Sequence, residues 1–172
     1  MIFITVGTEQ YPFDRLLHWV ARAIDRTGTR EQVIVQSGAC TFEIPGAVTH
    51  TTLRHREFDE IACAARVIIS HCGEGSFFNL RATGVPFLLV PRRFGLGEHI
   101  DDHQWELANV LNKIGAYVGW IPTDVHFFIQ GHPQPRHIQL SSQSLVDHLI
   151  NVYEPAEAGC LSKVADQTPC IH

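Results

Sequence analysis

The segment Val67-Ile68-Ile69-Ser70-His71-Cys72-Gly73-Glu74-Gly75-Ser76 decides the fold of this chain. It begins as a largely apolar run typical of a buried strand and continues into a helical pattern over residues 76–83. A glycine-rich turn between strand and helix leaves backbone N–H groups free at the positive end of the helix dipole, where diphosphates bind. Such turns also occur at strand ends for steric reasons alone, so the turn indicates a phosphate site without establishing one.

Short apolar strands alternate with helical segments on both sides of this segment. Strands are predicted over residues 2–6, 32–36, 67–70, 87–90 and 117–121, with a further short strand near Val48. Helices are predicted over residues 13–26, 58–65, 76–83 and 103–113. This alternation predicts an α/β fold, a Rossmann-like parallel sheet with helices on both faces. Such sheets bind ligands at the carboxyl ends of their strands. Four turns are expected there, namely Gly7-Thr8, Ser37-Gly38, His71–Ser76 and residues 92–104.

Composition narrows the class of protein. A chain of 172 residues that is 45% hydrophobic has enough apolar material for one globular domain with a sizeable core. The net charge is −5 and no block of Lys and Arg stands out, so the footprint of a nucleic-acid-binding protein is missing. Five cysteines without a C-x-x-C pair favour reduced thiols in the cytoplasm. The apolar start is short and lacks basic residues, which indicates a first strand and not a signal peptide.

The pattern changes after Ile121. Residues 122–141 contain prolines and histidines without clear periodicity. Residues 144–153 are predicted to form an amphipathic helix with Leu145, Leu149 and Val152 on one stripe. We therefore expect an α/β domain over residues 1–121, a C-terminal extension with one helix over 122–153, and a disordered tail over 154–172.

Three blocks of sequence carry a resemblance to a known family. They are Ser70-His71-Cys72-Gly73-x-Gly75-Ser76, then Gly84-x-Pro86 with Val90-Pro91, and then His103-Gln104-x-x-x-Ala108-Asn109. Over roughly residues 1–120 the chain resembles the C-terminal, donor-binding domain of glycosyltransferase family 28, which is half of a GT-B enzyme. It is most similar to the small catalytic subunits of two-component UDP-sugar glycosyltransferases that make exopolysaccharides and lipid-linked oligosaccharides.

The resemblance implies an activity and a partner. The chain would be the donor-binding catalytic subunit of a split enzyme that moves a hexose from a UDP-sugar to a glycan acceptor, expected to be lipid-linked. A separate membrane-anchored subunit would bind the acceptor and hold this cytoplasmic chain at the inner face of a membrane. The UDP-sugar is a substrate, and no cofactor, resident metal or nucleic acid is implied.

The resemblance also implies a nucleotide site. It assigns nucleotide and phosphate binding to Gly7, Thr8, His71, Gly73, Gly75, Ser76 and Asn79. Where the family usually has a glutamate three residues beyond the serine, this chain has Asn79, which bonds hydroxyls but supplies no negative charge. Uracil recognition would fall to the backbone near residues 36–40. Arg92 and Arg93 either help to neutralise the diphosphate or form a solvated pair on a loop.

Sugar binding and proton transfer involve the block that follows. His103 and Gln104 are the candidate donor-sugar residues, because Gln104 stands where the family has its sugar-reading glutamine. An inverting transfer requires a base that deprotonates the acceptor hydroxyl. Glu98 and His99 are candidates in this chain, although in the GT-B fold the base usually comes from the other half.

Two other functions remain open. One is a non-catalytic nucleotide-sugar-binding or regulatory subunit, which Asn79 and the unusual tail favour. The other is a metal-dependent hydrolase or epimerase, because His99 and His103 lie four residues apart among acidic residues. A loop held by carboxylate–histidine hydrogen bonds explains that cluster equally well.

Overall fold

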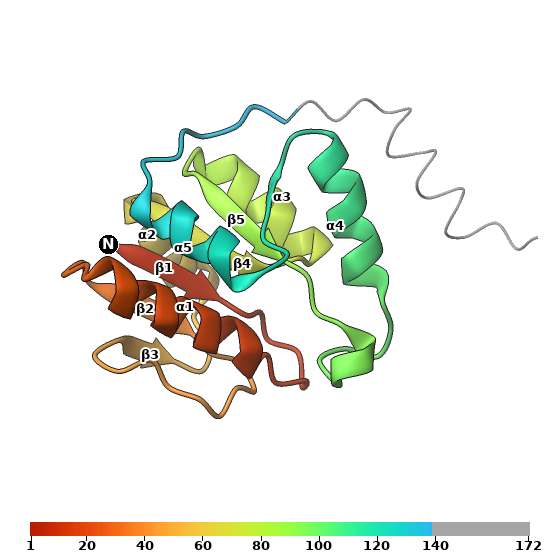
Figure 1. Ribbon diagram of the computed structural model, residues 1–172, viewed down its shortest axis with the longest axis horizontal. Coiled ribbons are helices and arrows are strands. Elements are labelled where there is room, and N and C mark those ends of the chain that lie inside the picture. Colours follow the sequence, from red (N-terminus) through yellow and green to blue (C-terminus); the bar gives the residue numbers. More distant parts are fainter. Residues whose placement is uncertain (139–172) are drawn as a thin grey trace, which may run out of the picture. The chain divides into compact units, whose positions relative to one another are not determined.

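The computed structural model describes residues 1–138, which form one compact unit. The strands in this part of the chain are β1 (Ile2–Thr5), β2 (Val33–Gln36), β3 (Val48–His50), β4 (Val67–His71), β5 (Phe87–Val90) and β6 (Tyr117–Val118). The helices are α1 (Asp14–Thr27), α2 (His55–Ala64), α3 (Glu74–Thr83), α4 (His103–Lys113) and α5 (Pro122–Gln130), with a 3₁₀ turn η1 (Phe94–Leu96). Figure 1 shows their arrangement.

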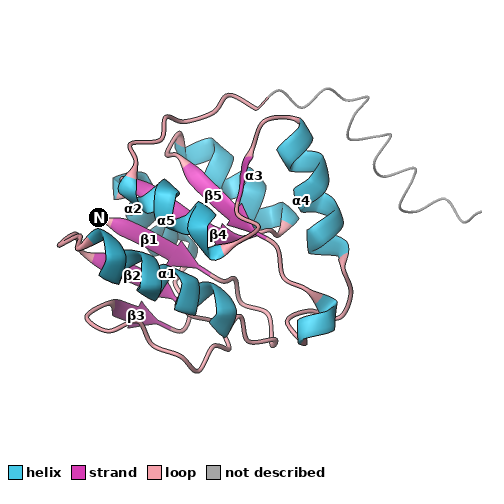
Figure 2. Cartoon of the chain, in the orientation of Figure 1, coloured by secondary structure: helices cyan, strands magenta, loops and turns pink. Residues whose placement is uncertain are grey.

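The strands form one parallel sheet in the order β3-β2-β1-β4-β5-β6. The order reverses at β1, which pairs with β2 on one side and with β4 on the other, so that Thr5 lies opposite both Gln36 and Ser70. Helices α1 and α5 lie together on one face of the sheet, and α2 and α3 cover the other (Figure 2). This is a doubly wound, Rossmann-like sheet, which confirms the predicted fold class. In such sheets the ligand crevice lies where the order reverses, here between β1 and β4.

The two central strands begin with three apolar residues each, because both faces of the sheet are covered. Residues 2–4 and 67–69 are fully buried, as expected for interior parallel strands. Helix α1 buries Leu16, Leu17, Val20 and Ala23 against the sheet. It ends at Gly28, whose left-handed backbone (φ 61°) lets its N–H bond the carbonyls of the last turn.

Helix α5 lies in a stretch for which the sequence showed no periodicity. It buries Val125, Phe128 and Ile129 and packs against α1. The carboxylate of Asp124 accepts the N–H groups of Trp120 and Ile121 at 2.8 and 3.1 Å. Those N–H groups are therefore not available for pairing with β5. As a result, strand β6 has 2 residues, fewer than the five expected. The compact unit consequently extends past residue 121 through Ile138.

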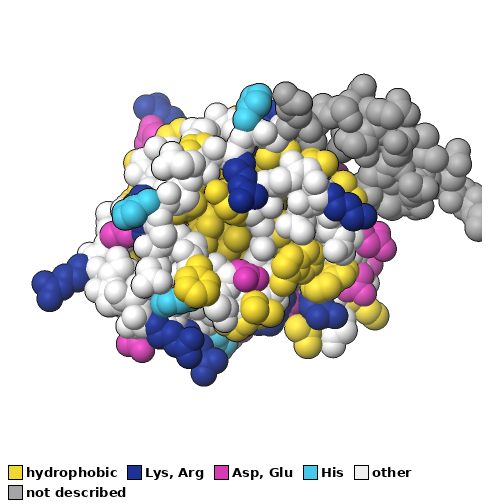
Figure 3. Space-filling model, turned by 45° about the horizontal axis from the view of Figure 1, so that its top comes forward, with side chains coloured by type: hydrophobic (Ala, Val, Ile, Leu, Met, Phe, Trp, Pro, Cys, Tyr) yellow, Lys and Arg dark blue, Asp and Glu magenta, His cyan; other side chains and the backbone are white. Residues whose placement is uncertain are grey.

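The predicted helix at 144–153 and the tail at 154–172 lie outside the described residues. Within residues 1–138 every helix is too short or too polar to cross a membrane. On the face shown in Figure 3, Lys and Arg side chains are scattered among uncharged and acidic ones and do not gather into a patch.

Candidate functional site

A cavity of about 450 Å³ opens at the carboxyl ends of the central strands. Its lining residues are Thr5, Gly7, Thr8, Glu9, Gln36, Leu53, His55, Phe58, His71, Gly73, Glu74, Gly75, Ser76 and Asn79. They come from the ends of β1, β2 and β4, from the start of α2 and from the first turns of α3. The cavity thus lies where the strand order reverses, and it contains every residue that the sequence assigned to nucleotide and phosphate binding.

The imidazole ring of His71 is enclosed by two glycines. A Cβ atom added to Gly7 would lie 2.7 Å from Cε1 of His71, and one added to Gly73 would lie 2.7 Å from Nε2. Gly7 also has a left-handed backbone with φ 80°. Both glycines are therefore required by the packing of the ring. At Gly75 a Cβ would meet no protein atom within 4 Å, so the space beside it is open.

His71 is a neutral side chain in this environment. Burial, together with the positive charge of Arg92, lowers its pKa to about 4. Its Nε2 lies 3.3 Å from the hydroxyl oxygen of Ser76, and its buried Nδ1 has no hydrogen-bond partner among the described residues. A neutral imidazole keeps one N–H donor and one acceptor, so His71 offers a ligand one hydrogen bond and no full charge.

Helix α3 begins directly at the cavity. Its N-cap is Gly73, and no side chain caps its first turn. The N–H groups of that turn are free of intrahelical acceptors and lie at the positive end of the helix dipole. The Glu74 carboxylate, which would repel an anion, is 3.1 Å from Nε2 of His103 on α4. Helix starts of this kind bind anions in proteins, and here His71 and Ser76 lie beside the free N–H groups.

The candidate sugar residues occupy different environments. His103 is part-exposed and is joined to the cavity wall through Glu74. Gln104 is only 2% exposed, and its Oε1 accepts the backbone N–H of Arg92 at 3.3 Å. In this arrangement Gln104 fastens α4 to the end of β5 and does not face the cavity, which differs from the sequence expectation.

Glu98 is engaged in a buried ion pair. Its two carboxylate oxygens accept Nε and Nη2 of Arg15 at 2.7 and 2.8 Å, and Oε2 also accepts the N–H of Arg93 at 3.0 Å. A carboxylate held by a guanidinium in this two-pronged way is fixed in its position. Glu98 thus holds the loop together, and it is not among the residues that line the cavity, whereas the sequence had offered it as a general base.

His99 lies between two carboxylates. Its Nδ1 is 2.8 Å from Oδ1 of Asp101, and its Nε2 is 3.2 Å from Oε2 of Glu9. Glu9 lines the cavity, so this pair connects His99 to the site. Sequence reasoning did not assign a role to Glu9 or Asp101. The position of Glu9 just after Gly7-Thr8 was the one signal that could have indicated it.

The acidic and histidine side chains of the 98–103 loop do not converge. His99 contacts Asp101 and Glu9, whereas His103 contacts Glu74 and Glu98 contacts Arg15. Among residues 1–138 no group of three or more His, Cys, Asp and Glu side chains is arranged to hold a metal ion. The contacts match a loop held by carboxylate–histidine hydrogen bonds.

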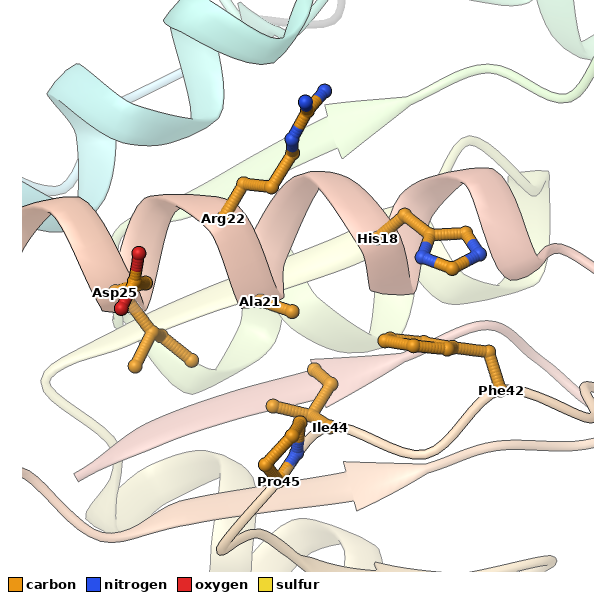
Figure 4. A pocket seen from close by; sticks show the side chains of 8 residues that line it. His18, Ala21, Arg22, Asp25, Phe42, Ile44 and Pro45 are labelled. Atoms are coloured by element: carbon orange, nitrogen blue, oxygen red, sulfur yellow. The ribbon is translucent and has the colours of Figure 1, made fainter.

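A second groove of about 530 Å³ runs beside α1, between this helix and residues 42–45. Figure 4 shows Ala21 facing Phe42, Ile44 and Pro45, with the guanidinium of Arg22 directed away from them. The groove lies along the side of α1 and shares no lining residue with the cavity at the strand ends. It is therefore separate from the candidate site.

A doubly wound parallel sheet with a glycine-rich strand-to-helix turn where its strand order reverses is the architecture of a Rossmann-type domain. A family model described as the glycosyltransferase family 28 C-terminal domain matches residues 1–118. The chain belongs to this family.

Curated relatives agree with this placement. The chain is 31% identical over 128 residues to the UDP-N-acetylglucosamine--N-acetylmuramyl-(pentapeptide) pyrophosphoryl-undecaprenol N-acetylglucosamine transferase of Clavibacter michiganensis subsp. michiganensis, covering 73% of this chain and 33% of the relative. It is 36% identical over 72 residues to the UDP-N-acetylglucosamine transferase subunit ALG13 of Cryptococcus neoformans var. neoformans, covering 41% of this chain and 34% of the relative. The chain thus spans about a third of the length of each relative.

Solved structures show the same fold. The calicheamicin glycosyltransferase CalG4 aligns with a TM-score of 0.52 at 17% identity, over 73% of this chain and 32% of that structure. MurG of Acinetobacter baumannii aligns with a TM-score of 0.51 at 16% identity, over 73% of this chain and 39% of that structure. The aligned portion of each is one part of a larger chain, as with the curated relatives.

Proposed function

We propose that this chain is the donor-binding catalytic subunit of a split glycosyltransferase that transfers a hexose from a UDP-sugar to a lipid-linked glycan acceptor. One observation carries the proposal. The start of α3, with His71 and Ser76 beside it, presents free N–H groups to a cavity where the sheet reverses its strand order. Membership of family 28 supports a nucleotide diphosphate as the ligand there.

The diphosphate is proposed to bind across the first turn of α3. The free N–H groups of that turn, one N–H of His71 and the Ser76 hydroxyl supply hydrogen bonds to its oxygens. In the transfer, the acceptor oxygen forms a bond to the anomeric carbon as the bond from that carbon to the β-phosphate oxygen breaks. Negative charge then grows on the departing UDP. Donors already placed at the turn stabilise that charge.

The nucleoside is proposed to lie over the other end of the cavity. Asn79 is exposed on the second turn of α3, where its amide can bond the ribose hydroxyls. Leu53 and Phe58 add apolar surface to the lining, suited to a uracil ring. Gln36 lies at the end of β2 in the same cavity, and the backbone near residues 36–40 is proposed to read the base.

His99 is the proposed general base on this chain. Asp101 bonds its Nδ1 and so orients the imidazole with Nε2 toward Glu9 at the cavity. The proton of the acceptor hydroxyl would pass to Nε2 as the new glycosidic bond forms. His103 is proposed to contact the hexose from the rim. Gln104 would have to leave its bond to Arg92 before it could do so.

The proposal includes a second subunit. One curated relative is itself named a transferase subunit, which supports a split enzyme. We propose that the acceptor is bound by a membrane-anchored partner, which places this chain at the cytoplasmic face of a membrane. Isolated protein is then expected to bind UDP yet transfer little sugar.

Calorimetric titration of the full chain with UDP and with uridine tests the site. His71→Ala and Ser76→Ala should each weaken UDP binding roughly ten- to a hundred-fold, the loss expected for a hydrogen bond to a charged group, while changing uridine binding little. Thr27→Ala, at the end of α1 and outside the cavity lining, is the matched control. Equal effects on both ligands, or no UDP binding by the unaltered protein, would overturn the assignment.

A non-catalytic nucleotide-sugar-binding subunit is the second candidate. The burial of Gln104 away from the cavity favours it, because the proposed sugar reader is then out of reach. Transfer assays with the partner subunit separate the two functions. Turnover that depends on this chain supports the enzyme. UDP-sugar binding without any turnover supports the regulatory subunit.

A further inference from the structure

Arg92 is a fully buried cation at the end of β5. Its Nη1 donates to the carbonyl oxygens of Tyr11 and Glu98 at 2.7 and 2.9 Å, and its Nη2 donates to the carbonyl of Val6 at 2.6 Å. The guanidinium also lies over the ring of Phe13, 4.8 Å from its centroid. Arg92 thereby ties the loop after β1 to the loop after β5, and the first of these loops lines the cavity.

Arg92 forms no direct ion pair among the described residues. The carboxylate of Glu98 is bound to Arg15 instead, and Nε of Arg92 has no hydrogen-bond partner among the described residues. Burial lowers the pKa of Arg92, while the carboxylates of Glu9 and Glu98 favour its charged form from a distance. A buried charge without a directly bonded carboxylate is costly, and an anion nearby offsets that cost.

We propose that Arg92 is a positioning residue of the donor site, which shapes the Val6–Tyr11 loop through its carbonyl bonds and whose charge favours a diphosphate in the adjacent cavity. This inference rests on the proposed function. Arg92 acts through the loop and through its field, without touching the ligand. Its neighbour Arg93 is exposed and packs on Trp105, so the two arginines have different roles.

The charge of Arg92 acts on the cavity. Burial of the ring and the positive charge of Arg92 both oppose protonation of His71. A bound diphosphate would interact favourably with the charge of Arg92. The charge that opposes protonation of His71 thus favours the ligand.

Two substitutions separate the geometric and electrostatic contributions. Arg92→Met removes the charge and the carbonyl bonds while keeping an apolar chain over Phe13. Arg92→Lys keeps the positive charge but lacks the guanidinium, whose two terminal nitrogens bond three carbonyl oxygens. We expect Arg92→Met to lower the preference for UDP over uridine about tenfold, near the lower end for losing an interaction with a charged group. Arg92→Lys should keep most of that preference and weaken both ligands together.

Arg66 offers a matched control. It bonds the carbonyls of Ile129 and Gly131 and also pairs with Glu31, at the opposite end of the sheet. Arg66→Met should lower the thermal midpoint without changing the ratio of UDP to uridine affinity. The pKa of His71, followed by imidazole NMR in the full chain without nucleotide, gives a second measurement. It should rise in Arg92→Met and stay unchanged in Arg66→Met.

The outcomes distinguish this inference from the proposed function. Unaltered protein that fails to bind UDP overturns the proposed function and the ligand part of this inference together. Unaltered protein that prefers UDP to uridine, with the same preference in Arg92→Met, overturns the role of Arg92 alone. A His71 pKa that does not respond to Arg92→Met also overturns it. If Arg92→Met does not fold, Arg92→Lys provides the test. This variant keeps the positive charge, so loss of its preference for UDP over uridine would contradict the electrostatic role of Arg92.

Discussion

The ring of His71 occupies the space that a side chain at Gly7 would need, since a Cβ there would lie 2.7 Å from Cε1 of His71. The end of β1 and the end of β4 are thus fitted to each other at the point where the sheet reverses its order. This contact places the imidazole between the two strand-end turns that line the cavity. The glycine and the histidine therefore form one structural unit.

Gly7→Ala tests this unit. The substitution meets both a left-handed backbone (φ 80°) and the His71 ring. Gly46→Ala is the matched control, because Gly46 has φ 78° but open space around its Cβ. The backbone strain common to both should cost about 1–2 kcal/mol, and the steric overlap at Gly7 should add about 1–3 kcal/mol. Urea unfolding measures both variants, and equal losses would contradict the contact.

The ion pair between Arg15 and Glu98 is expected to stabilise the fold and not to act in proton transfer. Glu98→Gln leaves Arg15 without its partner in a largely buried position, which should lower the free energy of unfolding by about 3 kcal/mol. Glu60→Gln breaks the exposed pair with Arg56 and should cost less than about 0.5 kcal/mol. Thermal unfolding gives both values. A pH profile of turnover that loses its acidic limb in Glu98→Gln would restore Glu98 as the base.

His71 makes stability depend on pH in a defined window. Its pKa is about 4 in the folded chain, against an ordinary value of 6.5. Between these values the unfolded chain binds more protons than the folded one, so the free energy of unfolding falls as pH is lowered from about 6.5 to about 4. The loss is about 3 kcal/mol at most. Denaturant unfolding across this range should show the slope in the unaltered protein, and a His71→Gln variant that retains the full slope would refute the assignment.

Asp101→Asn tests His99 as the general base. Loss of the carboxylate removes the acceptor that orients the imidazole, so turnover with the partner subunit should fall about tenfold or more while UDP affinity stays unchanged. His99→Ala should reduce turnover about a hundred-fold or more. Glu60→Gln, which breaks the exposed pair with Arg56 away from the cavity lining, is the control. Full activity in Asp101→Asn would place the base on the partner.

Local sequence determined the elements and their order. The bounds predicted for β5 and α4 agree with the structure, because a buried parallel strand needs a short apolar run and a covering helix needs a periodic stripe. The glycine-rich turn after β4 likewise predicted where the cavity lies. Helix α5 was missed because nine residues give too few turns to establish a period.

Only the tertiary structure decided which side chains meet at the strand ends. Glu98 pairs with Arg15, 83 positions away, and Arg92 reaches the carbonyl of Val6, 86 positions away. The first pairing engages Glu98, a candidate base, in an ion pair, and the second belongs to Arg92, which is a buried cation and not a solvated loop residue. Periodicity reports only the neighbours of a residue along its own element. Contacts between loops depend instead on how the whole sheet brings its strand ends together. For that reason the sequence alone determined the fold class and the edge of the sheet where the cavity lies, but not the partners of the charged groups there.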